Sequence, residues 1–405
     1  MYPSYPAPSD KALELEAALR TFMAEEVLPR EAEVRKSRQS AAGDPHVVPP
    51  EVEELKTIAR ERGLWNLFLP SESGLTQLEY AVLAEMLGWS ELGPEATNSS
   101  APDTGNMELL HLLGTDEQKQ QWLEPLLAGE IRSSFAMTEP AVASSDATNI
   151  ETSIVRDGDD YVINGRKWWI TGAADPRCKL LIVMGKTDPD AETYVQQSMV
   201  IVPIDTHGVE IVRSLPVMGF QHFQGHCEIT FTDVRVPATN ILGVEGGGFA
   251  AAQARLGPGR IHHVMRALGS GERALALMSK RSVERVAFGK PLAKRDSVRQ
   301  EIAESRIALD QARALCHHAA YVIDSEGNKA ARHLVAEAKV AVPRAVLAVI
   351  DRAIQLHGGG GLSDDFPLAE MWSWHRAMRL FDGPDEVHLM TLDRAEVMRE
   401  PLFPL

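Results

Sequence analysis

The sequence predicts an α+β multidomain fold: a helical N-terminal domain, a middle antiparallel β-barrel or sandwich, and a C-terminal helical bundle. Apolar residues recur at helical spacing near both ends of the chain, whereas β-rich runs fill the middle with no helical pattern between them. The 405 residues are enough for about two to four domains. We place the domains at residues 1–130, 131–242 and 243–405.

The N-terminal third has the spacing of amphipathic helices. One helix is predicted by apolar residues at three- and four-residue steps: Leu15, Leu19, Phe22 and Met23. Thr76 followed by Glu79 has the pattern of a capping box, in which each side chain satisfies a backbone N–H at a helix start. Thr115 and Gln118 repeat the pattern, so helices are predicted to begin at both places.

The middle of the chain is rich in β-branched and aromatic residues. Within DYVINGRKWWIT, Asn164-Gly165 separates two such runs and predicts a hairpin turn, because both residues can adopt a positive φ. Further strands are predicted for LLIVMGK, SMVIVPID, VEIVRSL and CEITFTDVRV.

Helical spacing returns after Phe249 and continues to the end. The run RHLVAEAKVAVPRAVLAVIDRAIQLHG is apolar on most sides, which predicts a buried helix that stops at residues 358–361, all glycine. Pro343 lies inside this run and lacks a backbone N–H, so we expect a kink or a break there.

Charge and composition exclude several classes of protein. The 41 Lys and Arg against 57 Asp and Glu give a formal net charge of -16, the wrong sign for a general nucleic-acid or anionic-membrane binder. No apolar run approaches the ~18 residues of a membrane-spanning helix, and the N-terminus does not resemble a secretory signal. Three well-separated cysteines predict reduced thiols in an intracellular protein, cytoplasmic or, in a eukaryote, in an organelle matrix.

The histidines do not have the spacing of metal ligands. His262-His263 and His317-His318 are adjacent pairs, and neighbours on a helix point in different directions, so we expect surface or interface residues and no metal. The run His357 to Gly360 resembles the H-G-G-G loop of lipases, but no G-x-S-x-G motif accompanies it, which favours a helix stop.

Two segments carry more polar side chains than a turn requires. Residues 135–150, FAMTEPAVASSDATNI, lie between the helical and β regions, where a cofactor cleft and an ordinary capped loop both fit. The nearby Trp168-Trp169 pair fits either a stacking surface or a core. In residues 380–388, LFDGPDEVH, a turn fixes the backbone beside Asp382, although composition alone favours a solvated acidic loop.

Taken together, six ordered motifs resemble the acyl-CoA dehydrogenase family, the flavoenzymes that desaturate acyl-CoA thioesters. The motifs are GTDEQKQQWLEPLLAGE, FAMTEP with Ser145-Asp146, INGRKWWITGA, VRVPATNILG, ERVAFGKPL and IQLHGGGGL. The resemblance covers essentially the whole chain, and the D-G-P-D-E-V-H motif resembles the subgroup of family members ten and eleven.

The resemblance implies FAD as the cofactor. The residues that it assigns to FAD within the chain are Phe135, Met137, Thr138, Ser145, Trp169 and Thr171. By the same resemblance, Trp169 and Thr171 cover the flavin beside its hydride-accepting nitrogen.

Further residues are implied to act between subunits. Arg285 and Phe288, in the E-R-x-x-F-G motif, correspond to residues that reach the FAD of a neighbouring subunit. Gln355, Gly358 and Gly359 match a stretch that crosses the dimer interface, where a glycine backbone can approach a nucleotide closely. We therefore expect a homodimer or homotetramer with FAD sites at the interface.

The resemblance also implies the reaction. Asp382 takes the place of the family's glutamate base, which removes the α proton of an acyl-CoA while hydride leaves the β carbon for FAD. Arg260 matches an arginine near the base and substrate, whereas Pro384 and Glu386 replace residues that commonly face the cofactor and receive no flavin contact. The implied pathway is fatty-acid or branched-acid degradation, with an electron-transfer flavoprotein as acceptor.

Two other functions fit the same scaffold. An acyl-CoA oxidase or flavin monooxygenase would reoxidise with oxygen and, as an oxidase, form peroxide. A non-catalytic acyl-CoA- or flavin-binding protein would show no spectral change with any thioester. The length and branching of the acyl chain are not set by the sequence.

Overall fold

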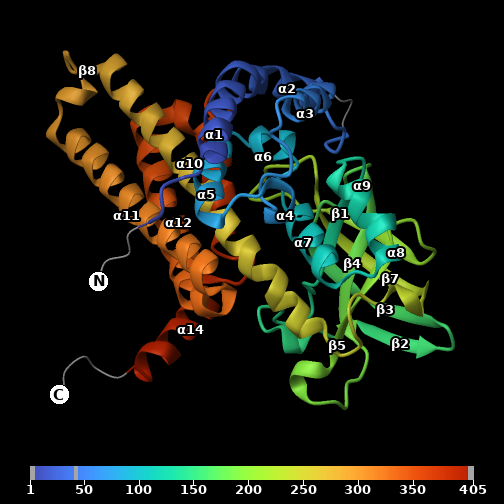
Figure 1. Ribbon diagram of the computed structural model, residues 1–405. Coiled ribbons are helices and arrows are strands. Elements are labelled where there is room, and N and C mark those ends of the chain that lie inside the picture. Colours follow the sequence, from blue (N-terminus) through green and yellow to red (C-terminus); the bar gives the residue numbers. More distant parts are fainter. Residues whose placement is uncertain (1–4, 41–43, 400–405) are drawn as a thin grey trace. The chain divides into compact units, whose positions relative to one another are not determined.

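The computed structural model describes residues 5–40 and 44–399, which divide into two compact units (Figure 1). The first unit comprises Met1–Pro29, Arg62–Pro94 and Arg260–Leu405, and the second comprises Arg30–Glu61 and Glu95–Gly259. Helices precede and follow a β-sheet along the chain, as predicted for the fold class. The boundaries of the three domains proposed from the sequence stay predictions.

The first unit is helical apart from one small hairpin. Its elements are α1 (Asp10–Phe22), the π-helical turn Met23–Val27, α4 (Pro70–Ser73), α5 (Gln77–Leu87), the larger part of α10 (Gly248–Glu284), β8 (Val286–Ala287), β9 (Lys290–Pro291), α11 (Asp296–Glu326), α12 (Asn328–His357), α13 (Leu368–Met378) and α14 (Asp385–Val397). Helix α12 packs against α11, α13 and α14, and α11 also packs against α5 (Figure 1).

Both predicted capping boxes are confirmed. At the start of α5, the Glu79 N–H donates to Thr76 Oγ1 over 3.1 Å, and the Thr76 N–H donates to Glu79 Oε2 over 2.9 Å. At the start of α8 (Asp116–Gln118) in the second unit, Thr115 and Gln118 exchange the same two bonds. These bonds satisfy backbone N–H groups that a helix start leaves free.

Helix α12 runs without interruption from Asn328 to His357, so the chain does not break at Pro343. The alternative, a kink at Pro343, stays a prediction. Pro343 is buried among the helices that pack around α12, and this packing keeps the helix continuous although one N–H is missing. The predicted stop is confirmed: the chain leaves the helix at Gly358, whose φ of 62° is easy only for glycine.

Glycines allow α5 and α10 to pack closely within the first unit. A Cβ on Gly269 would overlap the carbonyl oxygen of Glu85, and a Cβ on Gly88 would overlap the carbonyl oxygen of Arg266. Ser270 Oγ donates to the Gly88 carbonyl oxygen over 2.8 Å, which ties the two segments together. Backbone therefore lies directly against backbone at this crossing.

The second unit is built around a seven-stranded, mostly antiparallel sheet with strand order β1-β4-β2-β3-β7-β6, and β5 pairs with β4. The strands are β1 (Arg132–Ala136), β2 (Ser153–Asp157), β3 (Asp160–Thr171), β4 (Cys178–Lys186), β5 (Gln197–Pro203), β6 (Val209–Ser214) and β7 (His226–Pro237). Its helices are the larger part of α2 (Leu28–Ser40), α3 (Pro50–Glu61), the end of α6 (Leu92–Ala96), α7 (Asp103–Leu113), α8 and α9 (Glu124–Leu127). The pairing of β1 with β4 is parallel, a departure from the all-antiparallel expectation.

The hairpin turn predicted at Asn164-Gly165 is wrong, because both residues lie inside the continuous strand β3. The turn between β2 and β3 is at Gly158, whose φ is 65°. Gly165 is needed because a Cβ there would overlap the side chain of Thr152. The Asn164 amide instead bonds Asp233 on β7, at 2.8 Å from the Asp233 N–H to Asn164 Oδ1.

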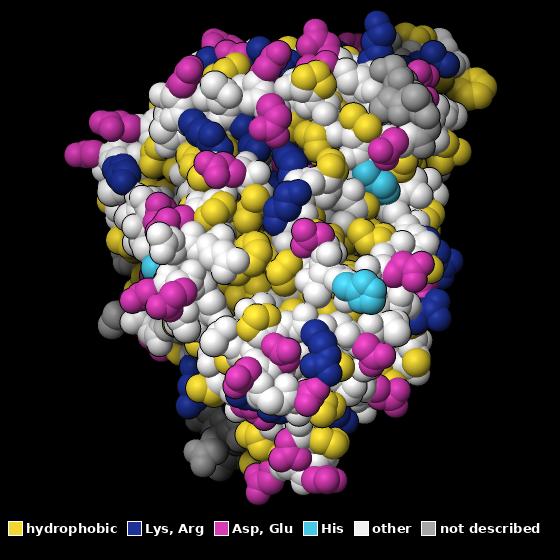
Figure 2. All heavy atoms as spheres, turned by 90° about the vertical axis from the view of Figure 1, so that its right-hand side faces the viewer, with side chains coloured by type: hydrophobic (Ala, Val, Ile, Leu, Met, Phe, Trp, Pro, Cys, Tyr) yellow, Lys and Arg dark blue, Asp and Glu magenta, His cyan; other side chains and the backbone are white. Residues whose placement is uncertain are grey.

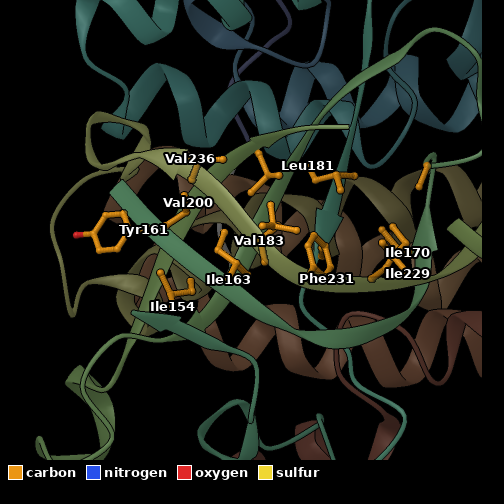
Figure 3. Packing of buried hydrophobic residues seen from close by; sticks show 14 of the residues in the cluster. Ile154, Tyr161, Ile163, Ile170, Leu181, Val183, Val200, Ile229, Phe231 and Val236 are labelled. Carbon is orange, nitrogen blue, oxygen red and sulfur yellow. The ribbon is translucent and has the colours of Figure 1, made fainter. Parts of the chain in front are cut away.

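Buried aliphatic and aromatic side chains from β2, β3, β4, β5 and β7 form one core cluster (Figure 3). Ile163, Val183 and Phe231, from three different strands, lie together in it (Figure 3). Strand β6, by contrast, is exposed along most of its length. The core thus gives the sheet one stable side from which its loops extend.

On the face drawn in Figure 2, acidic side chains lie among basic and apolar ones. None of the helices in residues 5–40 and 44–399 combines the length and the apolar character that are needed to cross a bilayer.

The close crossing of α5 and α10 gives a stability prediction. We expect Gly269→Ala to lower the free energy of unfolding by about 1–3 kcal/mol, because backbone atoms must move to make room for the methyl group. Gly259→Ala is the matched control, since it lies in the same helix but faces open space, and should change stability by at most ~1 kcal/mol. Urea unfolding followed by circular dichroism measures both; equal stabilities would contradict the close packing.

Candidate active site

A fully buried lysine on β3 fixes the segment that follows β1 in the second unit. Lys167 Nζ donates to the carbonyl oxygens of Met137 over 2.9 Å and of Met184 over 2.7 Å, and to Glu139 Oε1 over 2.8 Å. Burial lowers the pKa of Lys167 to about 8, although the Glu139 carboxylate opposes this shift. The predicted flavin residues Met137 and Thr138 therefore lie on a backbone that an ammonium group holds from inside the sheet.

The carboxylate of Glu139 is equally constrained. It accepts from the Glu151 N–H over 2.8 Å, the Thr152 N–H over 2.9 Å and Thr152 Oγ1 over 2.6 Å. Burial opposes its charge, but Lys167 and these hydrogen bonds outweigh burial and lower the pKa of Glu139. The Glu139 N–H donates to Ser144 Oγ, which ties in the loop that carries the exposed Ser145.

Trp169 and Thr171 lie beside this segment. The Trp168 N–H donates to the Thr138 carbonyl oxygen over 2.9 Å, so residues 137–139 and 168–171 run side by side. The pairing of β3 with β7 is irregular between Lys167 and Ile170, and Trp169 has a φ of 57° there. Trp169 is 41% exposed, which makes it a surface for stacking rather than part of the core.

Phe135 is half-buried at the end of β1, and a side chain missed by the sequence analysis holds it. The Arg255 guanidinium lies 4.0 Å from the centre of the Phe135 ring, within the range of a cation–π contact. Arg255 Nε also donates to Asn106 Oδ1 over 3.0 Å, and Nη2 donates to the Pro102 carbonyl oxygen over 3.3 Å. No spacing in the sequence distinguishes Arg255 from other helical arginines.

The second unit thus brings together most of the residues predicted to bind FAD within the chain. The exposed indole of Trp169 offers an aromatic face, and the hydroxyls of Thr138, Ser145 and Thr171 offer hydrogen bonds nearby. A planar ring system with a polar edge needs both kinds of group. The residues present fit an isoalloxazine ring.

In the first unit, Asp382 lies on the turn between α13 and α14, and α10 and α12 hold the backbone of this turn. Arg260 Nε donates to the Asp382 carbonyl oxygen over 2.8 Å. Lys339 Nζ donates to the carbonyl oxygens of Phe381, over 2.9 Å, and of Met378. Burial lowers the pKa of Lys339 to about 8, opposed by the charge of Asp382. The predicted pair Arg260 and Asp382 is therefore brought together, through the backbone.

His263 lies against the carboxylate itself. Its Nδ1 is 3.3 Å from Asp382 Oδ2, and the Asp382 side chain is 21% exposed, so the carboxylate is both held and accessible. The expectation that His262-His263 are surface or interface residues is wrong for His262, which is fully buried and bonds Gln77 Oε1 over 2.8 Å. The i, i+3 spacing of Arg260 and His263 was a signal that could have found this contact, because such residues share a helix face.

The turn is also fixed at its far end. Asp385, at the start of α14, is buried and forms ion pairs with Arg379 over 2.7 Å and Arg344 over 2.9 Å. Burial opposes its charge, but the two arginines outweigh burial and lower the pKa of Asp385. His388, one turn further on, is buried, and burial lowers its pKa to about 4 with help from Arg260 and Lys339.

The residues predicted to act between subunits are all exposed in the single chain. Phe288 is 98% exposed at the tip of the β8–β9 hairpin, where its φ is 50°. Arg285 lies just before this hairpin and is also exposed. Gln355 lies in the last turn of α12, Gly358 and Gly359 follow the helix, and a Cβ on either glycine would meet open space. These side chains are free of the core and available to another molecule.

A surface cavity of about 680 Å³ in the second unit contains none of the predicted residues. It is lined by Asp44, His46, Val47, Val48, Glu53, Ala174, Pro176, Arg177 and Ile211. The part of the chain that the structure describes has no group of three His, Cys, Asp or Glu side chains placed to hold a metal ion.

Family models match almost the whole chain in three consecutive stretches. The acyl-CoA dehydrogenase N-terminal, middle and C-terminal domain models match residues 9–130, 134–234 and 246–396. "Probable acyl-CoA dehydrogenase FadE2" of Mycobacterium tuberculosis is 65% identical over 395 residues, which is 97% of each chain. "Acyl-CoA dehydrogenase family member 11" of Gallus gallus is 52% identical over 96% of this chain and 51% of its own length, so the chain spans about half of that relative.

Solved structures agree with these sequence matches. The structure of butyryl-CoA dehydrogenase from Megasphaera elsdenii superposes with a TM-score of 0.82 at 27% identity, over 98% of this chain and 100% of that chain. The similarity therefore extends over both units of the structure.

The buried histidines predict acid sensitivity. Burial lowers the pKa of His222 to about 4 and of His226 to about 3, below the ordinary value of 6.5. The unfolded state then binds more protons as the pH falls below ~6.5, so stability present at neutral pH is lost from pH ~6.5 down to ~4 for His222 and ~3 for His226. Each histidine contributes up to about 1.4 kcal/mol per pH unit to the loss.

Urea unfolding at pH 7.5, 6 and 5 measures this slope. His226→Gln should flatten it by about the contribution of one histidine, whereas the exposed His207→Gln should leave it unchanged. An equal slope in wild type and His226→Gln would contradict the burial of a neutral imidazole at position 226.

Proposed function

Because the chain belongs to the acyl-CoA dehydrogenase family, we propose that it desaturates an acyl-CoA thioester between the α and β carbons with FAD as electron acceptor. The fold class, the oxidoreductase class and the FAD cofactor predicted from the motifs are those of this family. The observation that carries the proposal is the fixed position of Asp382 beside Arg260 and His263.

Asp382 is the proposed base. A general base needs a carboxylate that is accessible to the substrate and held in one place. The Asp382 side chain is partly exposed, and Arg260, Lys339 and the ion-paired Asp385 hold its turn. Its backbone carbonyl is occupied by Arg260, so this arginine positions the base through the main chain.

The residues that would hold FAD are those the motifs single out. Phe135, Met137, Thr138, Ser145, Trp169 and Thr171 would bind it within the chain. When bound, FAD supplies the two-electron chemistry, and the protein supplies position and electrostatics. Lys167 and Glu139 support this role, because they fix the backbone of residues 137–139 without using the side chains proposed to meet the cofactor.

The remaining residues are proposed to act across an interface between two copies of the chain. Phe288 and Arg285 would contact the FAD of a neighbouring copy, and Gln355, Gly358 and Gly359 would lie at the same interface. Their exposure supports this arrangement, since a large aromatic side chain rarely remains fully exposed without a partner. A homodimer or homotetramer follows from it, and an electron-transfer flavoprotein is the proposed electron acceptor.

The role of Asp382 gives the central prediction. Asp382→Asn should remain yellow with bound FAD, but its anaerobic bleaching by acyl-CoA should slow by ~10²–10⁴-fold, because the amide cannot accept the α proton. Stopped-flow absorbance of the flavin band measures the rate over a panel of acyl-CoA thioesters.

The control for this experiment is Asp382→Glu, which keeps a carboxylate and should retain part of the bleaching rate. Bleaching of Asp382→Asn at the wild-type rate would place the base elsewhere. Peroxide formed in proportion to turnover would make the protein an oxidase, and a wild-type protein with no bound flavin would overturn the proposal.

The exposed hairpin gives a second prediction. Phe288→Ala should weaken FAD retention by about tenfold or more, as truncation of a buried aromatic contact at an interface does. The fold should not change, because Phe288 is 98% exposed in the single chain. Val283→Ala, at an exposed position near the end of α10, is the control. Flavin content after gel filtration, with molar mass from light scattering, measures both; full retention by Phe288→Ala would contradict the assignment.

A further inference from the structure

Three side chains of the second unit, beginning with the predicted flavin contact Thr171, form a hydrogen-bonded row. Thr171 and His226 are cross-strand partners of β3 and β7, and Thr171 Oγ1 lies 2.9 Å from His226 Nδ1. The other ring nitrogen of His226, Nε2, lies 2.8 Å from His222 Nδ1. The two imidazoles meet edge to face at 83°, with 5.1 Å between their centres. Both nitrogens of His226 are therefore engaged.

Trp169 lies beside His226, the middle of these three side chains. Its ring centre is 6.1 Å from that of His226. Ile170 and its strand partner Cys227 point to the opposite face of the sheet, into the core cluster, as alternation along a strand requires. Thr171 and His226 thus share a face of the sheet with the exposed indole.

Burial decides the state of the two imidazoles. His222 and His226 are both buried, and burial lowers their pKa values to about 4 and about 3. The nearby charges of Arg38, for His222, and of His46, for His226, act in the same direction. A neutral imidazole has one N–H donor and one acceptor nitrogen. The two hydrogen bonds that join Thr171, His226 and His222 therefore run in the same direction at any moment.

The direction determines what the Thr171 hydroxyl can do. If His226 donates to Thr171, the threonine keeps its own O–H to donate on the opposite side. If Thr171 donates to His226, its oxygen can only accept on that side. A hydroxyl without a histidine partner would rotate freely between the two.

We propose that His226, held by His222, is a positioning residue that fixes the direction in which the Thr171 hydroxyl bonds FAD. The inference rests on the proposed function, which puts Thr171 beside the hydride-accepting nitrogen. That nitrogen accepts a hydrogen bond in oxidised flavin and carries an N–H in reduced flavin. A hydroxyl held in one direction bonds one redox state of the flavin better than the other. His222 and His226 therefore set the affinity of the protein for oxidised FAD relative to reduced FAD.

The test compares the affinities of the holoenzyme for oxidised and reduced FAD, through the midpoint potential of the bound flavin. His226→Leu should change the ratio of the two affinities by about tenfold, which corresponds to the loss of one hydrogen bond. For a two-electron couple, a tenfold change in this ratio shifts the midpoint potential by about 30 mV. His226→Gln, which keeps a donor and an acceptor, should restore most of the wild-type ratio.

Two further variants separate positioning from mere structural support. In a Thr171→Val background, His226→Leu should have no additional effect on the ratio, because there is no hydroxyl left to position. Cys227→Ala changes the next residue of β7 on the opposite, core-facing side, and should lower thermal stability while the ratio stays at the wild-type value.

A measurement on the unmodified holoenzyme keeps the proposal testable if a variant fails to fold. Histidine ¹⁵N spectra should show one tautomer each for His222 and His226, with no change between pH 5 and 8. The positioning role would be overturned by two tautomers in exchange or by an unchanged midpoint potential in His226→Leu. It would also be overturned if His226→Leu shifted the midpoint potential as much in the Thr171→Val background as in the wild type. A wild-type protein that fails to bind FAD would instead overturn the proposed function.

Discussion

Two buried lysines, one in each unit, hold backbone segments: Lys167 holds the segment with the residues proposed to bind FAD, and Lys339 holds the turn with the proposed base. Lys167 donates to the carbonyl oxygens of Met137 and Met184, and Lys339 donates to those of Met378 and Phe381. An ammonium group in a buried position costs free energy unless its protons are bonded. Each lysine therefore holds its loop firmly, because releasing a carbonyl would leave a buried charge with fewer partners. Both segments remain rigid without using the side chains that are proposed to meet cofactor and substrate.

Three of the residues proposed to meet cofactor or substrate have strained backbone conformations. Trp169, Phe288 and Asp382 have φ values of 57°, 50° and 53°, a region that side chains other than glycine rarely adopt. Such a conformation costs of the order of 1–3 kcal/mol and persists only where the surroundings enforce it. At Trp169 the irregular pairing of β3 with β7 does so, and at Asp382 the bonds from Arg260 and Lys339 do so. At both of these positions a side chain that is at least partly exposed extends from a backbone that its neighbours hold.

Local signals in the sequence predicted those features that depend on neighbouring residues. The capping boxes at Thr76 and Thr115 depend on bonds over three residues, and the motifs around Trp169 and Asp382 depend on contiguous residues. The prediction of a hairpin turn at Asn164-Gly165 was wrong because this residue pair is typical of a turn. Here the glycine instead leaves room for the side chain of Thr152, which is distant in the sequence. Contacts that join remote parts of the chain give no such signal.

Arg255 and Lys339 illustrate that limit. Each lies in a helix with ordinary spacing, and each acquires its role only when folding brings a partner far along the chain to it: Phe135 for Arg255 and Phe381 for Lys339. The sequence therefore identified the groups proposed to do chemistry better than the groups that hold them. A motif is local, but the support behind it is tertiary.

The aspartate at position 382 shows why that support matters. An aspartate has one side-chain torsion angle fewer than the glutamate of many family members, so its carboxylate has less freedom to adjust to a substrate. The place of the carboxylate is then decided mainly by the backbone, and only secondarily by the side chain. Arg260, Lys339 and the ion-paired Asp385 fix that backbone on both sides of the turn, and His263 lies against the carboxylate. A shorter base is thus carried on a turn with anchors on both sides, because accuracy that a flexible side chain could have supplied must come from the main chain.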